Sequence, residues 1–336
     1  MSKQDDNIVF FDIDPLLGKR DKMTNLITRR NFLGKLIAGF AMLAGWGSIK
    51  AGCSLRGSDK GSLHLVFYTD VHARTEWDTP VAMARAADAI NARKADLVIA
   101  GGDLITDGFQ SSAAAVAPRW DAYMKMHQAI KADVYPAMGN HDLVAAIPTD
   151  GTPAADYPRA VYMDRLGLER TYYSFTAVGY HFIILDSIEV TRDQYYYQGI
   201  IRTQQLQWLR QELATVPKRT PIIIVTHIPL LSSFFSASEG ATYAARPNRV
   251  VVNNREVLKT MEKHNVVLVL QGHLHVNEMI RWQNTTFITG GAVCGKWWRG
   301  AWYGTEEGFY DITLTGNQVE CSYIDYGWEA RRPPNQ

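Results

Sequence analysis

Residues 63–72 read LHLVFYTDVH, an apolar and β-branched run that ends in Asp70, Val71 and His72. Such a run is typical of a buried strand. In an extended chain, side chains two residues apart face the same way, so Asp70 and His72 are expected to leave the strand end together. A carboxylate beside an imidazole can bind a metal, but one such pair is also common in proteins that bind none.

The same arrangement recurs four more times along the chain. Apolar runs at 97–100, 134–138, 222–226 and 266–270 are each followed by polar residues, and these are Asp103, Asn140, His141, Asp142, His227, His273 and His275. Ligands of open α/β sheets bind beyond the carboxyl ends of the strands. We therefore expect these side chains to converge on one site. Imidazoles mixed with oxygen donors favour Mn, Fe or Zn over calcium.

The segments between these runs indicate the fold class. Helical periodicity is found at 81–93, 120–131 and 204–213, and further strands are predicted at 172–175, 181–186 and 286–289. Apolar strands that alternate with helices favour an α/β fold with a largely parallel sheet, buried on both faces. Three long segments lack a regular pattern and are expected to shape the mouth of the site: 106–118, 145–158 and 231–249.

Composition narrows the function classes. The chain has 336 residues, of which 46% are hydrophobic, and a formal net charge of +1. This excludes a disordered chain and disfavours a nucleic acid polymer as substrate or partner. Three cysteines are too few for a four-thiolate metal site. Cys294 and Cys321 are able to pair in an oxidising compartment if their separation allows it, which the sequence leaves open.

Residues 1–53 have the layout of an export signal. Thr28–Lys35 reads TRRNFLGK and precedes an uncharged run, 36–49, which is typical of a twin-arginine signal peptide. The alternative is an ordinary amphipathic helix that starts at Thr28. Ala51-Gly52-Cys53 resembles a lipoprotein processing site, although Lys50 departs from that pattern, so a lipid anchor at Cys53 stays open. We expect the twin-arginine export machinery as a partner and a periplasmic or extracytoplasmic location, with membrane anchoring as a lipoprotein possible. Residues 54–62 then form a linker to a single domain, 63–328.

The five motifs, in this order, resemble those of the calcineurin-like metallophosphoesterases. Within that family the resemblance is closest to class III cyclic-nucleotide phosphodiesterases and purple-acid-phosphatase-like proteins. It implies a four-layer αββα sandwich of two sheets flanked by helices, with a dinuclear metal site at the carboxyl ends of the strands. Purple acid phosphatases have a tyrosine ligand three positions after the bridging aspartate, where this chain has Thr106. We therefore expect a pair of divalent metals.

The resemblance also implies a role for each residue of the site. Asp70, His72 and His275 would hold one metal. Asn140, His227 and His273 would hold the other, and Asp103 would bridge the two. His141 would protonate the leaving oxygen, and Asp142 would either orient His141 or cap a helix. A metal-bridging hydroxide would attack phosphorus in line.

The expected activity is that of an exported, metal-dependent phosphoesterase. A small phosphodiester or nucleotide-like substrate is favoured, and a phosphomonoesterase or a phosphoprotein phosphatase with the same site is the alternative. A non-catalytic scaffold of the same fold is the alternative from another class. Lys296, Trp297, Trp298 and Arg299 combine cations with indoles and are candidate substrate-binding residues, or else a packed edge.

Overall fold

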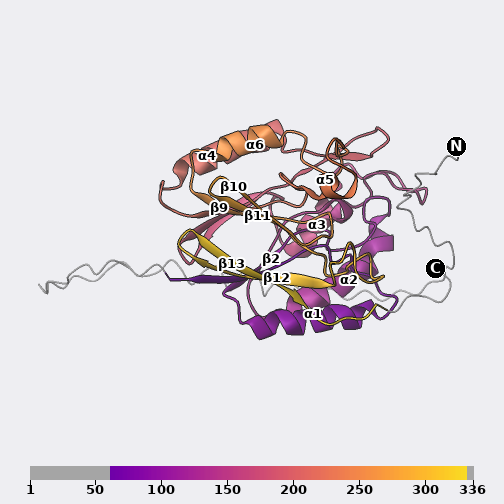
Figure 1. Ribbon diagram of the computed structural model, residues 1–336. Coiled ribbons are helices and arrows are strands. Elements are labelled where there is room, and N and C mark those ends of the chain that lie inside the picture. The colour runs from indigo at the N-terminus through magenta and orange to yellow at the C-terminus, as the bar shows by residue number, and fades with distance from the viewer. Residues whose placement is uncertain (1–60, 331–336) are drawn as a thin grey trace, which may run out of the picture. The chain divides into compact units, whose positions relative to one another are not determined.

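Strand β1 (Leu63–Tyr68) lies at the centre of the first of two large sheets (Figure 1). The computed structural model describes residues 61–330, so the predicted export signal, the Cys53 site and most of the linker lie outside the described residues. This sheet has the order β13-β12-β1-β2-β3. Its other strands are β2 (Leu97–Ala100), β3 (Val134–Pro136), β12 (Gly308–Thr315) and β13 (Gln318–Asp325). The pairs β1–β2 and β2–β3 are parallel, whereas β12 is antiparallel to both β1 and β13.

The second sheet has the order β10-β11-β9-β8-β5-β4. Its strands are β4 (Tyr173–Ala177), β5 (Tyr180–Ile184), β8 (Ile222–Val225), β9 (Val266–Gln271), β10 (Glu278–Trp282) and β11 (Thr285–Thr289). The four central strands are parallel, and β4 and β10 add antiparallel edges. A separate ribbon pairs β6 (Ile188–Val190) with β7 (Tyr197–Gly199).

Helices cover the outer faces of both sheets. In Figure 1, α1 (Thr79–Arg93) and α2 (Ala113–Ala129) lie on one side, and α4 (Thr203–Thr215) and α6 (Asn254–Met261) on the other. The remaining helices are short: η1 (Asn140–Asp142), α3 (Ala160–Leu166) and α5 (Phe234–Ser238). The predicted four-layer αββα sandwich is thus confirmed. Within the described part of the chain, no helix combines the length and apolarity needed to cross a bilayer.

Both faces of β1 are buried, which explains its continuous apolar sequence. Leu65 and Phe67 belong to one hydrophobic cluster, which also contains Phe182, Val225 and Leu268 of the second sheet. The alternate residues of β1 belong to the other cluster, together with residues of α1 and α2. Because successive side chains of a strand point to opposite faces, one strand contributes to two cores.

Two sequence expectations need correction. The sheets are mixed rather than largely parallel, because the β10–β11 and β12–β13 hairpins add antiparallel strands. In addition, two of the three long segments are not irregular throughout, since α2 begins at Ala113 and α5 (Phe234–Ser238) lies within 231–249. The Ser112 side chain caps this helix by accepting from the Ala115 N–H at 3.3 Å. Pro118 removes only one intrahelical hydrogen bond near the start of a helix that begins with three alanines.

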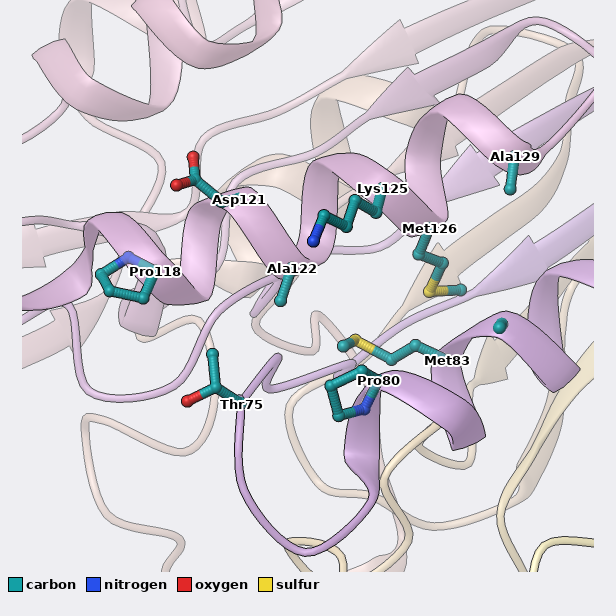
Figure 2. Close-up of a pocket in the computed structure, with 10 residues that line it drawn as sticks. Thr75, Pro80, Met83, Pro118, Asp121, Ala122, Lys125, Met126 and Ala129 are labelled. Atoms are coloured by element: carbon teal, nitrogen blue, oxygen red, sulfur yellow. The ribbon is translucent and has the colours of Figure 1, made fainter. Parts of the chain in front are cut away.

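Helices α1 and α2 leave a groove between them (Figure 2). Its volume is about 450 Å³, and Met83 and Met126 point into it from the two helices. Pro80 and Pro118 lie near its other end. Its ten lining residues include none of the predicted metal ligands. The groove is therefore separate from the strand ends.

Candidate metal centre

The predicted ligands come together at the carboxyl ends of β1, β2, β3, β8 and β9. His275 Nε2 lies 3.2 Å from Asp70 Oδ1, and His227 Nε2 lies 3.2 Å from Asp103 Oδ2. His72 Nε2 lies between the two carboxylates, 3.8 Å from Asp70 Oδ1 and 3.5 Å from Asp103 Oδ2. The seven predicted ligands are each at most 6% exposed. We call these seven residues the cage: Asp70, His72, Asp103, Asn140, His227, His273 and His275.

Asp103 is shared between two groups of potential ligand atoms. In one group, atoms of Asp103, His72 and His141 lie within 4.8 Å of one another. In the other, atoms of Asp103, His227 and His273 do so. A carboxylate common to two clusters is the arrangement that a bridging ligand requires. Asn140 directly precedes His141, whose backbone N–H donates to Asp103 Oδ1 at 2.7 Å, so the turn that carries Asn140 lies against this carboxylate.

The backbone of the cage is mostly left-handed, which the sequence analysis did not anticipate. Positive φ angles occur at five of its seven residues: Asp70 (54°), His72 (43°), Asp103 (52°), His273 (73°) and His275 (57°). Each costs about 1–2 kcal/mol for a residue with a side chain. The Asp-x-His and His-x-His pairs therefore turn sharply after their strands instead of continuing extended, and still direct their side chains to one place.

Glycines permit the close approach of these turns. A Cβ on Gly139 would lie 2.1 Å from the backbone nitrogen of Asp103. A Cβ on Gly272 would lie 2.8 Å from Asp70 Oδ2. Side chains at these two positions would push the strand ends apart. The residues before Asn140 and His273 therefore have to be glycine.

Backbone carbonyls fix the tautomer of three cage histidines. A carbonyl oxygen can only accept a hydrogen bond, so the ring nitrogen facing it must carry the proton. Nδ1 of His227 donates to Gly101 O at 2.8 Å, Nδ1 of His275 donates to Gly295 O at 2.6 Å, and Nε2 of His273 donates to Asn248 O at 2.8 Å. The other nitrogen of each ring is then a lone-pair donor, as metal-ligating histidines require.

The donor atoms fit a pair of metals. Asp70 Oδ1, Asn140 Oδ1 and His227 Nε2 are buried and have no hydrogen-bond partner. Buried polar atoms are usually hydrogen-bonded, so three such atoms in one cage are suited to binding cations. Imidazole nitrogens, carboxylates and one amide oxygen are ligands that suit divalent Mn, Fe or Zn.

The two carboxylates of the cage are ionised. Burial alone would raise the pKa of Asp70, but His275 and His72 hold that pKa well below its usual value. Burial also opposes the charge of Asp103, yet the imidazoles of His227 and His141 lower its pKa. Both carboxylates are therefore available as anionic ligands at neutral pH.

The histidines of the cage differ in the direction in which their pKa is shifted. Burial lowers the pKa of His72 to about 4 and the pKa of His273 well below its usual value, so both rings are neutral at pH 7. Burial also acts against protonation of His227, but Asp103 outweighs it and raises its pKa to about 9. A proton on His227 would have to leave when a metal binds, which makes metal binding pH-dependent.

His141 lies at the edge of the cage with its side chain 20% exposed. Its ring packs edge-on against His72, with 4.8 Å between the ring centroids. The backbone N–H of Asp107 donates to His141 Nδ1 at 3.2 Å, and the Asp107 carboxylate lies 3.9 Å from the same atom. In the neutral ring Nδ1 accepts and the single proton lies on Nε2, which can donate a hydrogen bond. Transfer of a proton requires the imidazolium, whose Nδ1–H would face the Asp107 carboxylate.

Asp107 was missed by sequence reasoning, and Asp142 has a different role from the orienting one. The Asp142 carboxylate accepts from the backbone N–H groups of Leu104 at 2.7 Å and Gly139 at 2.8 Å. It thus joins the loop after β2 to the η1 turn. This is the helix-capping role that the sequence left open, and not the orienting of His141. The only sequence signal for Asp107 is an acidic residue in the loop that follows Asp103.

The four residues 296–299 do not form one surface. Trp297 lies against the His72 ring, with 3.9 Å between centroids. Trp298 is 1% exposed, and its indole N–H donates to the carbonyl of His72 at 3.0 Å, so it faces the interior. Lys296 Nζ lies 4.5 Å from the Trp302 ring centroid, and the Arg299 guanidinium lies 5.9 Å from that of Trp77.

Cys294 and Cys321 are both free thiols. Cys294 is buried behind His275, with its sulfur 3.8 Å from His275 Nδ1. Cys321 lies on β13, with its sulfur 3.8 Å from that of Met279. The two thiols therefore have separate neighbours, and the pairing that the sequence left open is not formed.

Comparisons with known proteins agree with this geometry. Residues 63–277 match the family described as calcineurin-like phosphoesterase. A dimetal phosphatase from Danio rerio has a similar structure, with a TM-score of 0.56 and 17% identity over 79% of this chain and 99% of that one. A search of curated protein sequences found no significant match.

Two further solved structures share the fold at the same level of identity. A purple acid phosphatase from yellow lupin (Lupinus luteus) seeds has a TM-score of 0.53 and 17% identity, over 79% of this chain and 52% of that one. GAP50, the anchor in the inner membrane complex of Plasmodium, has a TM-score of 0.50 and 17% identity, over 79% and 85%. At this identity the likeness shows the fold alone.

Proposed function

The chain belongs to the calcineurin-like phosphoesterase family, and from that premise we propose that it hydrolyses small phosphate esters at the cage. The observation that carries this proposal is the sharing of Asp103 between two groups of potential ligand atoms. Asp70, His72 and His275 would hold one divalent metal, and Asn140, His227 and His273 the other. When bound, such a pair activates water and stabilises charge on the phosphoryl oxygens.

His141 supplies the proton in this proposal. It acts as the imidazolium, with Nδ1–H facing the Asp107 carboxylate at 3.9 Å; it gives its Nε2 proton to the leaving oxygen and becomes the neutral ring. Its ring is the exposed imidazole at the edge of the cage, where a leaving oxygen can approach. Proton donation at this position contributes about 10²–10⁴-fold to a hydrolytic rate.

The preferred substrate is a phosphodiester or nucleotide-like ester. Trp297 lies beside His141, at 4.9 Å between ring centroids, and offers an apolar surface for an organic group. The near-neutral chain lacks the charge excess that a nucleic acid polymer would favour. A phosphomonoesterase or phosphoprotein phosphatase would use the same ligands, and Mn, Fe and Zn all suit them.

A scaffold that only binds partners would not need this cage. The GAP50 structure is an anchor with a similar fold, so the fold by itself does not distinguish the two roles. A non-catalytic chain has no reason to keep seven convergent ligands at a cost in backbone strain, or to keep His141 beside them. These retained residues support catalysis.

The direct test is turnover by the metal-loaded protein. We expect hydrolysis of bis-(4-nitrophenyl) phosphate, with 4-nitrophenyl phosphate as the comparison that ranks diester against monoester. His141→Ala should lower kcat by about 10²–10⁴-fold and retain both metals. His264→Ala, at the opposite end of β9, is the matched control and should be neutral. Absence of turnover of both esters by the wild-type protein would refute the proposal.

We also propose that the protein is exported through the twin-arginine machinery to the periplasm, with a possible lipid anchor at Cys53. The support is the sequence of residues 28–49. Replacing Arg29 and Arg30 by Lys should leave the precursor inside the cell, as fractionation would show. Normal export of that variant would contradict the proposal. Labelling with a fatty acid, with Cys53→Ser as control, decides lipidation.

A further inference from the structure

One approach to the cage lies beside His141 and Trp297. The seven cage residues are nearly inaccessible to solvent, whereas these two neighbours are partly exposed. A substrate that enters on this side passes both side chains. If the leaving oxygen takes its proton from His141, the organic group on that oxygen lies within reach of Trp297.

The Trp297 indole forms a wall of this entrance. Its ring centroid lies 3.9 Å from that of His72, 4.9 Å from that of His141 and 5.6 Å from that of His275. The contact with His275 is stacked and that with His141 is edge-on. One indole thus touches two cage histidines and the candidate proton donor.

The loop that carries Trp297 is held in a strained conformation. Trp297 and Trp298 have positive φ angles of 54° and 64°, which are uncommon for bulky residues. Hydrogen bonds hold the turn: Trp298 N–H donates to Cys294 O at 2.6 Å, and the Trp298 indole donates to His72 O at 3.0 Å. Trp298 therefore anchors the loop to His72, the residue that Trp297 covers. Strain maintained by such anchors is typical of functional sites.

The surface beyond Trp297 is also aromatic. Lys296 extends over the Trp302 ring, and Trp302 packs on Tyr303 with 4.7 Å between centroids. Tyr303 in turn packs on Phe234, at 4.9 Å, and is 60% exposed. Exposed aromatic rings next to a catalytic entrance are more easily explained by a ligand than by packing.

We propose that Trp297 is a specificity-determining residue, which selects phosphate esters whose leaving alcohol carries a planar aromatic ring. This inference rests on the proposed function and adds a substrate class to it. The ring packs against the indole while the leaving oxygen faces His141. Aromatic pairs of this kind are stronger than their buried area alone explains, so a planar ring is preferred to a saturated ring of the same size.

The test compares phenyl with cyclohexyl phosphate esters in the metal-loaded protein. The wild type should prefer the phenyl ester, and Trp297→Leu should lower the phenyl-to-cyclohexyl ratio of kcat/KM by about fivefold. Intrinsic reactivity cancels because the same two esters are used for each variant. Trp297→Phe should keep most of the preference. Trp282→Leu, 56% exposed at the far end of β10, should be unchanged.

Binding gives a readout that does not depend on turnover. Calorimetric Kd values for phenylphosphonate and cyclohexylphosphonate should show the same fivefold change in Trp297→Leu, with metal content unaltered. A second pair, adenosine monophosphate and ribose 5-phosphate, distinguishes the source of the ring. If Trp297→Leu also changes the ratio of Kd values for this pair, a nucleobase reaches Trp297. If it changes the ratio for the phenyl pair alone, the ring is attached to the leaving oxygen.

Two outcomes overturn the inference. Equal losses for phenyl and cyclohexyl ligands, or a loss of metal in both Trp297→Leu and Trp297→Phe, would make Trp297 a structural support of His72. An unchanged ratio in an active enzyme would refute the substrate class and leave the proposed function intact. A wild-type protein that turns over none of these esters, nor bis-(4-nitrophenyl) phosphate, would refute the proposed function itself.

Discussion

Two buried clusters of charge in this protein differ in how completely their atoms are paired. One is the cage, and the other is centred on Asp186. The Asp186 carboxylate accepts hydrogen bonds from Arg159 Nε at 2.6 Å, Arg159 Nη2 at 3.2 Å and Thr171 Oγ1 at 2.7 Å. Its backbone N–H and carbonyl both bond to the Gln205 amide, at 2.8 and 2.6 Å. The cage, in contrast, contains buried oxygen and nitrogen atoms without a hydrogen-bond partner.

The difference separates a structural cluster from a functional one. Buried charges are stable only when they are paired and hydrogen-bonded, and the Asp186 cluster meets that condition with its own side chains. In the cage, imidazoles face the two carboxylates, but buried ligand atoms stay without a hydrogen-bond partner and are available to cations. Left-handed backbone is likewise found at five cage residues, whereas Asp186, Arg159 and Gln205 have none.

The largest effect is expected from Asp103→Asn. The change keeps the size of the side chain but removes the charge shared by both ligand groups, so neither metal should stay bound at stoichiometric concentration. We expect kcat/KM to fall by at least about 10³-fold. Elemental analysis and steady-state kinetics on the same preparation measure the two losses. Retention of two metals by this variant would show that Asp103 does not bridge them.

Asp186→Ala should have the converse result. It leaves the Arg159 guanidinium buried without its carboxylate, and breaking a buried ion pair costs about 3–5 kcal/mol of unfolding free energy. Urea denaturation measures this loss. The folded fraction should keep its metals and its kcat. A variant that loses metal in proportion to stability would mean that the two clusters are coupled.

The positions of the cage ligands could be predicted because they depend on short-range sequence. Each of them directly follows an apolar strand, and parallel strands bring their ends to one edge. The role of Asp107 and the division between Trp297 and Trp298 could not be predicted. Both depend on left-handed turns, which place neighbouring side chains on opposite sides of the loop. No periodicity in the sequence reports such turns.

The fold shows the same contrast between features that a local sequence pattern reports and features that it does not. The parallel strands β1, β2, β8 and β9 are almost entirely apolar because both of their faces are largely buried, and this pattern is visible in the sequence. The β13 strand alternates half-buried and exposed positions, and the β12–β13 hairpin joins the sheet through the pairing of β12 with β1, which is distant from it in sequence. The mixed sheets therefore could not be predicted from the apolar runs alone.

Metal binding should have a smaller effect, a rise in Tm that depends on the cage and not on the Asp186 cluster. A ligand that binds only the folded state at 100 times its Kd stabilises that state by about 2.7 kcal/mol. Adding Mn or Zn to chelator-treated wild type should therefore raise Tm. Asp186→Ala should show the same increase from a lower starting Tm, because its cage is intact. Asp103→Asn should show none, and an equal increase in Asp103→Asn would indicate binding outside the cage.

The smallest effect concerns pH. Burial alone would raise the pKa of Asp186, but Arg159 holds that pKa below its usual value. A carboxyl with a lower pKa in the folded state stabilises the protein fully above the unfolded pKa of about 3.9, and this contribution is lost as pH falls through the folded value. The difference in unfolding free energy between wild type and Asp186→Asn should thus be constant from neutral pH down to about pH 5, and shrink below about pH 4.

Denaturant titrations of both proteins across this range test the sign. A difference that grows on acidification would mean that the Asp186 carboxyl is protonated in the folded protein, and the contrast with the cage would then no longer be one between paired and unpaired charges.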